Sequence, residues 1–217
     1  MLCRASLFLS VCLSTTVGFA HPSVQPTSTG TAVPEAATDG PSNPAVLTQA
    51  QLLERVNDLL NMFSGAPTAD DWTKLGPQAV PVLGGIARDK TTLVTRRKKA
   101  IAGLSFFTGQ DSRALLKTLV TSESESHRIR GQAALSYALV AGKDAVIDLV
   151  PLLSASKHRL REATIKAFAQ INDNSVVAPL TARLSLEPKN YLKAEIQKVL
   201  DARKAAGLGT VRPEGAK

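Results

Sequence analysis

"RIRGQAALSYA", at residues 128–138, is followed 31 positions later by "RLREATIKAFA", at residues 159–169. Both stretches begin with arginine, an apolar residue and a second arginine, and both carry an aromatic residue near their end. "RKKAIAGLSFF", at 97–107, aligns with them without a gap, and "YLKAEIQKVL", at 191–200, aligns after one inserted residue. Within each stretch the apolar residues recur every three or four positions, as on one face of a helix. The sequence therefore predicts a helical repeat with a period near 31 residues.

A second apolar helix is expected after each of the first three copies. These helices are expected to start near Asp111, Asp144 and Ser175, because such side chains accept hydrogen bonds from the free N–H groups of a first helical turn. Upstream, residues 76–89 read as one more second helix and residues 48–63 as a leading helix. Two helices per repeat unit are typical of an α-solenoid, in which each pair stacks on its neighbours and buries a continuous core.

These units resemble HEAT repeats. The resemblance rests on the arginine and alanine in the first helix and on an "xAVxxLxxLL" pattern in the second, seen in "QAVPVLGGI" (78–86) and "DAVIDLVPLL" (144–153). It extends over residues 76–200 and is weak before them. It implies an all-α, right-handed α-solenoid of about four to five antiparallel helix pairs, and it says little about function.

Each first helix carries one large side chain in the same column of the alignment: Phe106, Tyr137 and Phe168. Because these residues lie on the apolar stripe of their helices, we expect them to pack in the core between stacked units. An exposed binding role for the aromatic column is the alternative.

The chain is expected to have four parts. They are a signal peptide at 1–20, a Pro/Thr/Ser/Ala-rich linker at 21–46, the repeat domain at 47–206 and a flexible tail at 207–217. The first part has a positive start, a short apolar run and small residues before Ala20, which is the layout of a cleaved secretory signal. Both cysteines precede Ala20, so the predicted mature chain has no disulfide. We therefore predict a secreted or periplasmic protein.

Basic residues are concentrated at the starts of the first helices. Residues 47–206 hold 23 Lys and Arg against 15 Asp and Glu. A cation at a helix N-terminus meets the positive end of the helix dipole, so it needs a compensating partner. For one column we predict a structural ladder that ties each unit to the preceding one, and the resemblance to HEAT repeats implies the same: Lys99, Arg130, Arg161 and Lys193. For a second set we predict contacts with a partner: Arg96, Arg97, Arg128, Lys157 and Arg159.

Catalytic and metal-binding motifs were not found. His127 and His158 lie one repeat apart, and stacked helices about 8–10 Å apart hold imidazoles too far from each other to share a zinc ion easily. We therefore expect no cofactor, no metal and no enzymatic activity. The predicted function is an exported scaffold that binds another macromolecule, namely a protein. Two alternatives stay open: a polyanion-binding module that uses the basic edge, and a lyase-like or glycosylase-like enzyme, since HEAT-like scaffolds include both.

Overall fold

The computed structural model describes residues 47–62 and 67–207, and within these ranges the chain forms helices and no strand. The predicted signal peptide, the linker and the tail after residue 207 lie outside the described residues. None of the described helices is long and apolar enough to cross a membrane. The α-helices are α1 (Gln49–Asn61), α2 (Ala69–Thr73), α3 (Ala79–Arg88), α4 (Val94–Leu104), α5 (Gln110–Thr121), α6 (His127–Ala141), α7 (Val146–Leu149), α8 (His158–Gln170), α9 (Val177–Leu186) and α10 (Asn190–Ala205). Three 3₁₀ helices accompany them: η1 (Gly142–Ala145), η2 (Val150–Ser154) and η3 (Asn174–Val176).

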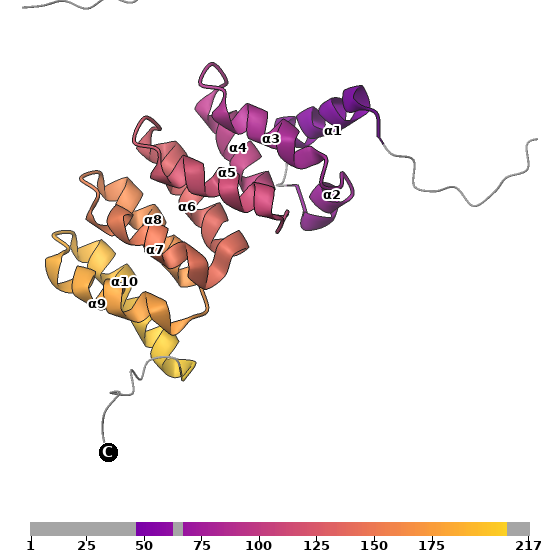
Figure 1. The fold of residues 1–217 in the computed structure, drawn as a ribbon. Helices are drawn as coiled ribbons and strands as arrows, with labels where there is room; N and C mark the ends of the chain where they lie inside the picture. Colours follow the sequence, from indigo (N-terminus) through magenta and orange to yellow (C-terminus); the bar gives the residue numbers. More distant parts are fainter. Residues whose placement is uncertain (1–46, 63–66, 208–217) are drawn as a thin grey trace, which may run out of the picture. The chain divides into compact units, whose positions relative to one another are not determined.

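The helices stack as pairs in chain order (Figure 1). The first helices α1, α4, α6, α8 and α10 pack on one another in one layer. The second helices α3, α5, α7 and α9 form the other layer, and α2 is a short turn between α1 and α3. The described residues thus contain four pairs followed by α10. This is the α-solenoid that the repeat predicts.

Local sequence signals explain where several helices begin and end. Thr48 and Gln51 form a reciprocal capping box that starts α1. The Ser126 side chain accepts a hydrogen bond from the N–H of Ile129 and so caps α6. Gly142, at a φ of 55°, ends α6 in a conformation that side chains disfavour.

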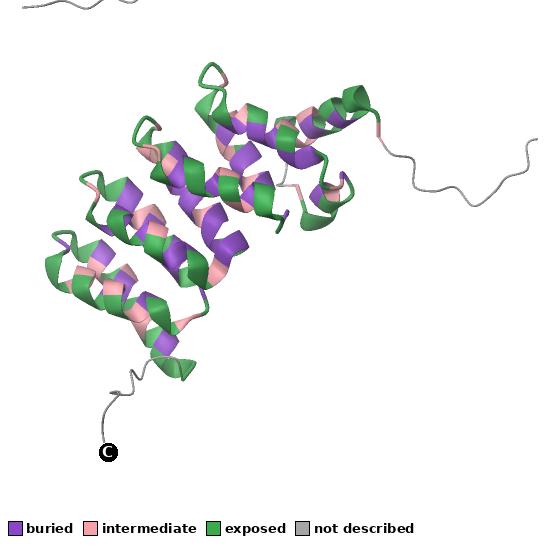
Figure 2. Cartoon of the chain, in the orientation of Figure 1, coloured by how far each residue is buried: buried purple, intermediate pink, exposed green. Residues whose placement is uncertain are grey.

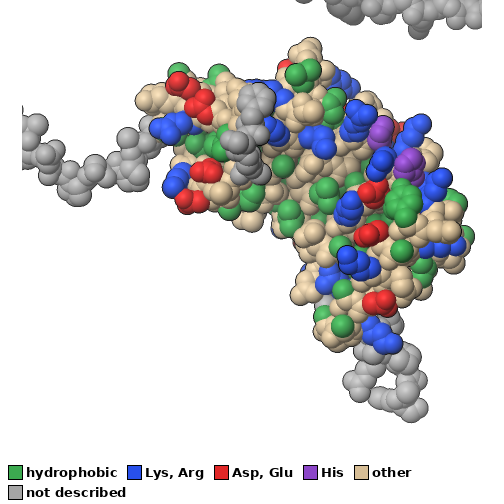
Figure 3. Space-filling model, turned by 180° about the vertical axis from the view of Figure 1, so that it is seen from behind, with side chains coloured by type: hydrophobic (Ala, Val, Ile, Leu, Met, Phe, Trp, Pro, Cys, Tyr) green, Lys and Arg blue, Asp and Glu red, His purple; other side chains and the backbone are tan. Residues whose placement is uncertain are grey.

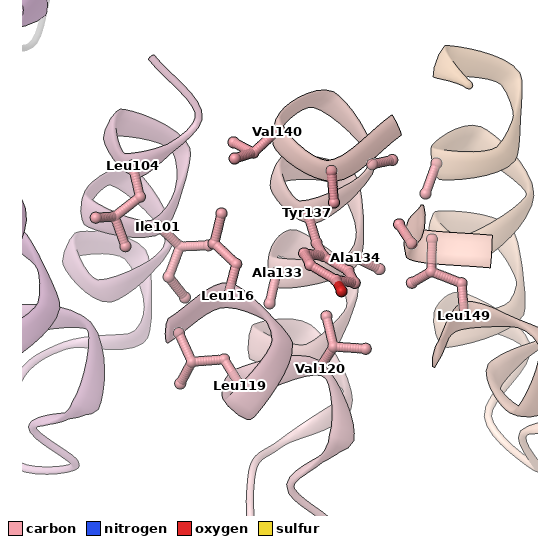
Figure 4. Close-up of a cluster of buried hydrophobic side chains, with 14 of the residues drawn as sticks. Ile101, Leu104, Leu116, Leu119, Val120, Ala133, Ala134, Tyr137, Val140 and Leu149 are labelled. Carbon is pink, nitrogen blue, oxygen red and sulfur yellow. The ribbon is translucent and has the colours of Figure 1, made fainter. Parts of the chain in front are cut away.

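In each layer the buried residues lie mainly on the helix faces turned toward the other helices (Figure 2). Figure 4 shows one cluster, in which Ile101, Leu116, Ala133 and Leu149 from four successive helices meet around Tyr137. Tyr137 is buried, and its hydroxyl donates a 2.8 Å hydrogen bond to Asp148. Burial, together with that carboxylate, raises the pKa of Tyr137 to about 12. The prediction that Tyr137 and Phe168 pack in the core is confirmed.

The prediction for Phe106 is wrong, because the first copy of the repeat is shifted by two residues. The helices α4, α6, α8 and α10 begin at residues 94, 127, 158 and 190, so their spacing is 33, 31 and 32 residues. The core position of Tyr137, eleventh in its helix, corresponds in α4 to Leu104, which is fully buried. Phe106 follows the end of α4 and is 37% exposed.

The second helix of the third pair is not a regular α-helix. It runs as η1, α7 and η2, with Pro151 near the start of η2. Proline has no N–H to donate and its ring crowds the preceding turn, which shortens α7 to four residues.

The expected N-caps of the second helices are also displaced. Asp111 lies in the first turn of α5 and Asp144 lies within η1. Asp173, two residues before the expected Ser175, supplies the cap by accepting a 2.8 Å hydrogen bond from the N–H of Ser175.

Candidate functional site

The fourth residue of α4, α6 and α8 ties its repeat to neighbouring parts of the chain. In α4 this residue is Arg97, whose Nε donates to the carbonyl of Ala87 at the end of α3, at 2.8 Å. In α6 it is Arg130, whose Nε donates to the carbonyl of Val120 near the end of α5, at 3.0 Å. Both acceptors lie ten residues earlier in the chain. These arginines therefore satisfy carbonyls that a helix C-terminus leaves unpaired.

The strongest of these ties joins Arg161 of α8 to Glu187, in the turn between α9 and α10. Nε and Nη2 of Arg161 donate to the two carboxylate oxygens, each at 2.8 Å, and Arg183 donates to the same carboxylate. The Glu187 side chain is fully buried. Burial alone raises the pKa of a carboxyl, but hydrogen bonds from Arg161, Arg183 and the backbone N–H of Lys189 outweigh it and lower the pKa of Glu187 to about 2.

A similar buried pair joins Arg97 to Glu125, in the turn between α5 and α6. Nη2 of Arg97 lies 2.7 Å from a Glu125 oxygen, and both side chains are more than nine-tenths buried. The expectation that Arg97 contacts a partner is therefore wrong. The two-residue shift of the first copy is the physical reason, because it places Arg97 in the ladder position that the gapless alignment assigned to Lys99.

The remaining ladder residues behave differently. Lys99 is exposed, and its Nζ donates to the carbonyls of Leu60 and Met62 at the end of α1, at 3.0 and 2.9 Å. Lys193 is half-buried and makes no side-chain hydrogen bond or ion pair with another described residue. At this end Arg203, which the repeat pattern does not mark, donates to Asn172 and to the carbonyl of Ala169 and so ties α10 to the end of α8.

The structure divides the residues expected to contact a partner. Besides Arg97, Arg96 is held within the fold, since its guanidinium donates to Asn61 and Asn57 of α1, both at 2.6 Å. Lys157 is exposed at the N-cap position of α8. Arg128 and Arg159 are both exposed, and Arg159 pairs with Glu162 at 3.1 Å while its side chain stays 71% exposed.

Arg128 and Arg159 meet at a groove that crosses the first helices α4, α6 and α8. We call this feature the first-helix groove, and its volume is about 330 Å³. Its walls carry Lys98, His127, Arg128, Gln132 and Arg159. Figure 3 shows Lys and Arg side chains gathered around the histidines on this side of the molecule.

The floor of the groove consists of Gly131, Leu135 and Ala163. A Cβ at Gly131 would lie 2.9 Å from that of Ala163, so the absence of a side chain lets α6 and α8 approach closely. Lys98 was not among the residues predicted from sequence. It comes one position after Arg97 and one before Lys99, and only the packing of α4 against α6 reveals that it lines the same groove as Arg128.

The groove has the chemistry of a binding surface. Cationic heads stand above an apolar floor, an arrangement that attracts anionic groups while giving apolar side chains a place to pack. Among the described residues, no group of three or more His, Cys, Asp or Glu side chains could hold a metal ion.

The two stacked helix layers and their repeated ties define this part of the chain as an α-solenoid. A family model of HEAT repeats matches residues 112–201, from α5 to α10, which confirms the resemblance to HEAT repeats over this stretch. Comparison with curated proteins finds no match.

Proposed function

We propose that this HEAT repeat unit is a non-catalytic scaffold that binds a partner protein through the first-helix groove. HEAT repeats typically serve as protein-interaction scaffolds. The observation that carries the proposal is the contrast between two sets of cations on the same helices. The guanidinium groups of Arg97, Arg130 and Arg161 donate hydrogen bonds to acceptors within the fold. Lys98 and Arg128 make no side-chain hydrogen bond or ion pair with another described residue, and both line the groove.

Unused donors beside an apolar floor support a contact surface. At exposed sites, a charge without an internal partner contributes little to folding. The same charge contributes to association when a partner supplies an acceptor and excludes water around it. The groove also draws on three consecutive repeats, which is how solenoids build an extended binding surface.

Site-specific photocrosslinking tests this function. A benzophenone amino acid at Gln132, on the groove wall, should crosslink one or a few proteins when the purified protein is incubated with an extract of its own cells. The same amino acid at Ile147, which is 78% exposed on α7 in the other helix layer, is the control. Crosslinks to the same proteins from both positions, or none from Gln132, would contradict binding through the groove.

We further propose that the scaffold is exported and acts outside the cytoplasm. The support is the sequence of the first 20 residues, with its short apolar run and the small residues that precede Ala20. Fractionation of cells that express the full chain tests this proposal, which predicts the protein in the medium or the periplasmic fraction.

A further inference from the structure

We infer that the first-helix groove binds an extended, acidic peptide segment of the partner. This inference rests on the proposed function and adds the chemistry of what the groove recognises. Its basis is the placement of cations on three successive helices, the length of the groove and the composition of its floor.

The groove continues beyond the hollow described above. A neighbouring hollow of about 240 Å³ is lined by Thr95, Lys99 and Ala102, and it shares Lys98 and Gln132 with the first. Together the two hollows reach from α8 across α6 to α4. Helices in contact are about 8–10 Å apart, so three of them span about 16–20 Å. An extended chain rises about 3.3 Å per residue, and a segment of five or six residues therefore covers the groove.

Charge complementarity identifies the side chains of that segment. Lys98, Arg128 and Arg159 stand on α4, α6 and α8, one cation to each helix. Carboxylates two residues apart on an extended peptide lie on the same face and are about 7 Å apart, which is close to the spacing of neighbouring helices. Arginine also pairs with carboxylate through two parallel hydrogen bonds. Glu162, which pairs with Arg159 and Lys166, occupies part of this cationic set, so the peptide competes with it at α8.

The floor favours a peptide over a nucleic acid or a sulfated polymer. Leu135, Gly131 and Ala163 offer an apolar surface between the cations, on which an apolar side chain between two acidic residues can pack. Single-stranded nucleic acids are usually held by aromatic side chains that stack on bases, and no Phe, Tyr or Trp side chain lines either hollow.

The test measures binding of defined probes to the purified repeat protein by fluorescence anisotropy. The probe is a labelled eight-residue peptide with glutamate and leucine alternating, and its control has glutamine in place of glutamate. We expect the glutamate peptide to bind and the glutamine peptide not to. Arg128→Glu and Arg159→Glu should each weaken binding about tenfold or more, because each removes a charge-assisted contact and adds repulsion.

Two variants separate charge from packing. Arg88→Glu changes an exposed arginine at the end of α3, in the other helix layer, and should leave binding unchanged. Leu135→Ala should weaken binding of the peptide without weakening binding of a heparin octasaccharide, because only the peptide packs an apolar side chain on the floor of the groove. Urea denaturation of each variant confirms that it is folded at the assay temperature.

Several results would overturn the inference. One is a Kd for the glutamate peptide above about 1 mM. Another is peptide binding that Arg128→Glu leaves unchanged. A third is arginine-dependent binding of heparin, or of an eight-nucleotide DNA strand, that is tighter than binding of the peptide. The proposed function fails separately, when Gln132 crosslinks no partner. If crosslinking at Gln132 persists in Arg128→Glu and excess glutamate peptide does not compete with it, the scaffold function stands and the acidic-peptide inference is wrong.

Discussion

Replacing Arg161 with alanine removes the guanidinium that faces the buried carboxylate of Glu187. Arg161 is 5% exposed and supplies two 2.8 Å hydrogen bonds to that carboxylate and two more to the carbonyls of Ala155 and Ser156. Removing one partner of a buried ion pair typically costs about 3–5 kcal/mol. Because Arg183 stays bonded to Glu187, we expect the lower half of this range for the free energy of unfolding.

Arg159→Ala is the matched control for this substitution. Arg159 lies two residues earlier on α8, which places it about 200° away around the helix axis. Its side chain is exposed and makes a surface pair with Glu162. Such pairs contribute about 0–1 kcal/mol, so we expect a loss below about 0.5 kcal/mol. Urea denaturation of both variants at pH 7 measures the difference.

The pH dependence gives a second measurement of the same tie. The ordinary pKa of a glutamate is 4.5 and that of Glu187 in the fold is about 2. At about 1.4 kcal/mol per pKa unit, this difference corresponds to about 3 kcal/mol of stability. Because the pKa is lowered by folding, this stability is fully present above pH 4.5 and is lost as the pH falls toward 2.

Arg161→Ala should therefore lose less stability than the wild type between pH 4.5 and pH 2, because the pKa of Glu187 rises when the guanidinium is gone. If Arg161→Ala and Arg159→Ala unfold at the same urea concentration at pH 7, or if the acid dependence is unchanged in Arg161→Ala, the buried tie does not stabilise the fold and the reasoning is refuted.

Arg97→Ala should lower the free energy of unfolding by about 3–5 kcal/mol, because it leaves the carboxylate of Glu125 buried without its partner. Lys99 is exposed, so Lys99→Ala should lower it by less than about 1 kcal/mol. Equal losses in urea denaturation would contradict the two-residue shift. Gly131→Ala should cost about 1–3 kcal/mol in thermal unfolding, because its Cβ meets another at 2.9 Å. Gly85→Ala, where no atom beyond the adjoining residues and the backbone of its own helix lies within 4 Å of the new Cβ, should instead stabilise α3 by about 0.5–1 kcal/mol, and a loss there would show that helix propensity does not govern the site. N-terminal sequencing of exported protein should start at His21, and an intact initiator methionine would disprove the signal peptide.

The repeat architecture could be predicted because apolar and basic residues recur at regular intervals along the sequence. From α4 onward, each first helix repeats its apolar stripe and its cation at nearly constant spacing, and the starts of these helices follow that spacing within two residues. The register of the first copy could not be obtained from a gapless alignment. Matching Phe106 to Tyr137 was favoured by residue type, while the structure pairs Leu104 with Tyr137. Loop lengths can change between units because only the helices must pack.

Only the burial of α4 decides the register of the first copy. Arg130 and Arg161 are each followed three positions later by a small buried residue, Ala133 or Thr164. In α4, Arg97 is followed in this way by Ala100 and Lys99 by Ala102, so the sequence alone offers both positions. Ala100 is fully buried and Ala102 is half-buried, which places Arg97 in the ladder.

The groove could be predicted only in part, because it depends on which side chains face each other between helices. Arg128 and Arg159 were recognised by their phase relative to the ladder residues. Arg96 was assigned to the same surface, but Asn57 and Asn61 of α1 hold it. The α1 segment lies outside the region that resembles the repeat, so its contacts with α4 could not be read from the periodicity.

The second and fourth residues of α6 and α8 serve different purposes, so substitutions at the two positions affect different properties of the protein. The fourth residue of α6 and α8 points toward neighbouring chain ends and is bonded there, while the second residue points to the groove about 200° away. A substitution at Arg130 or Arg161 alters stability, and one at Arg128 or Arg159 alters the charge of the groove with little effect on stability. Binding preference can therefore vary at the second position of α6 and α8 while the fourth position keeps the stack intact.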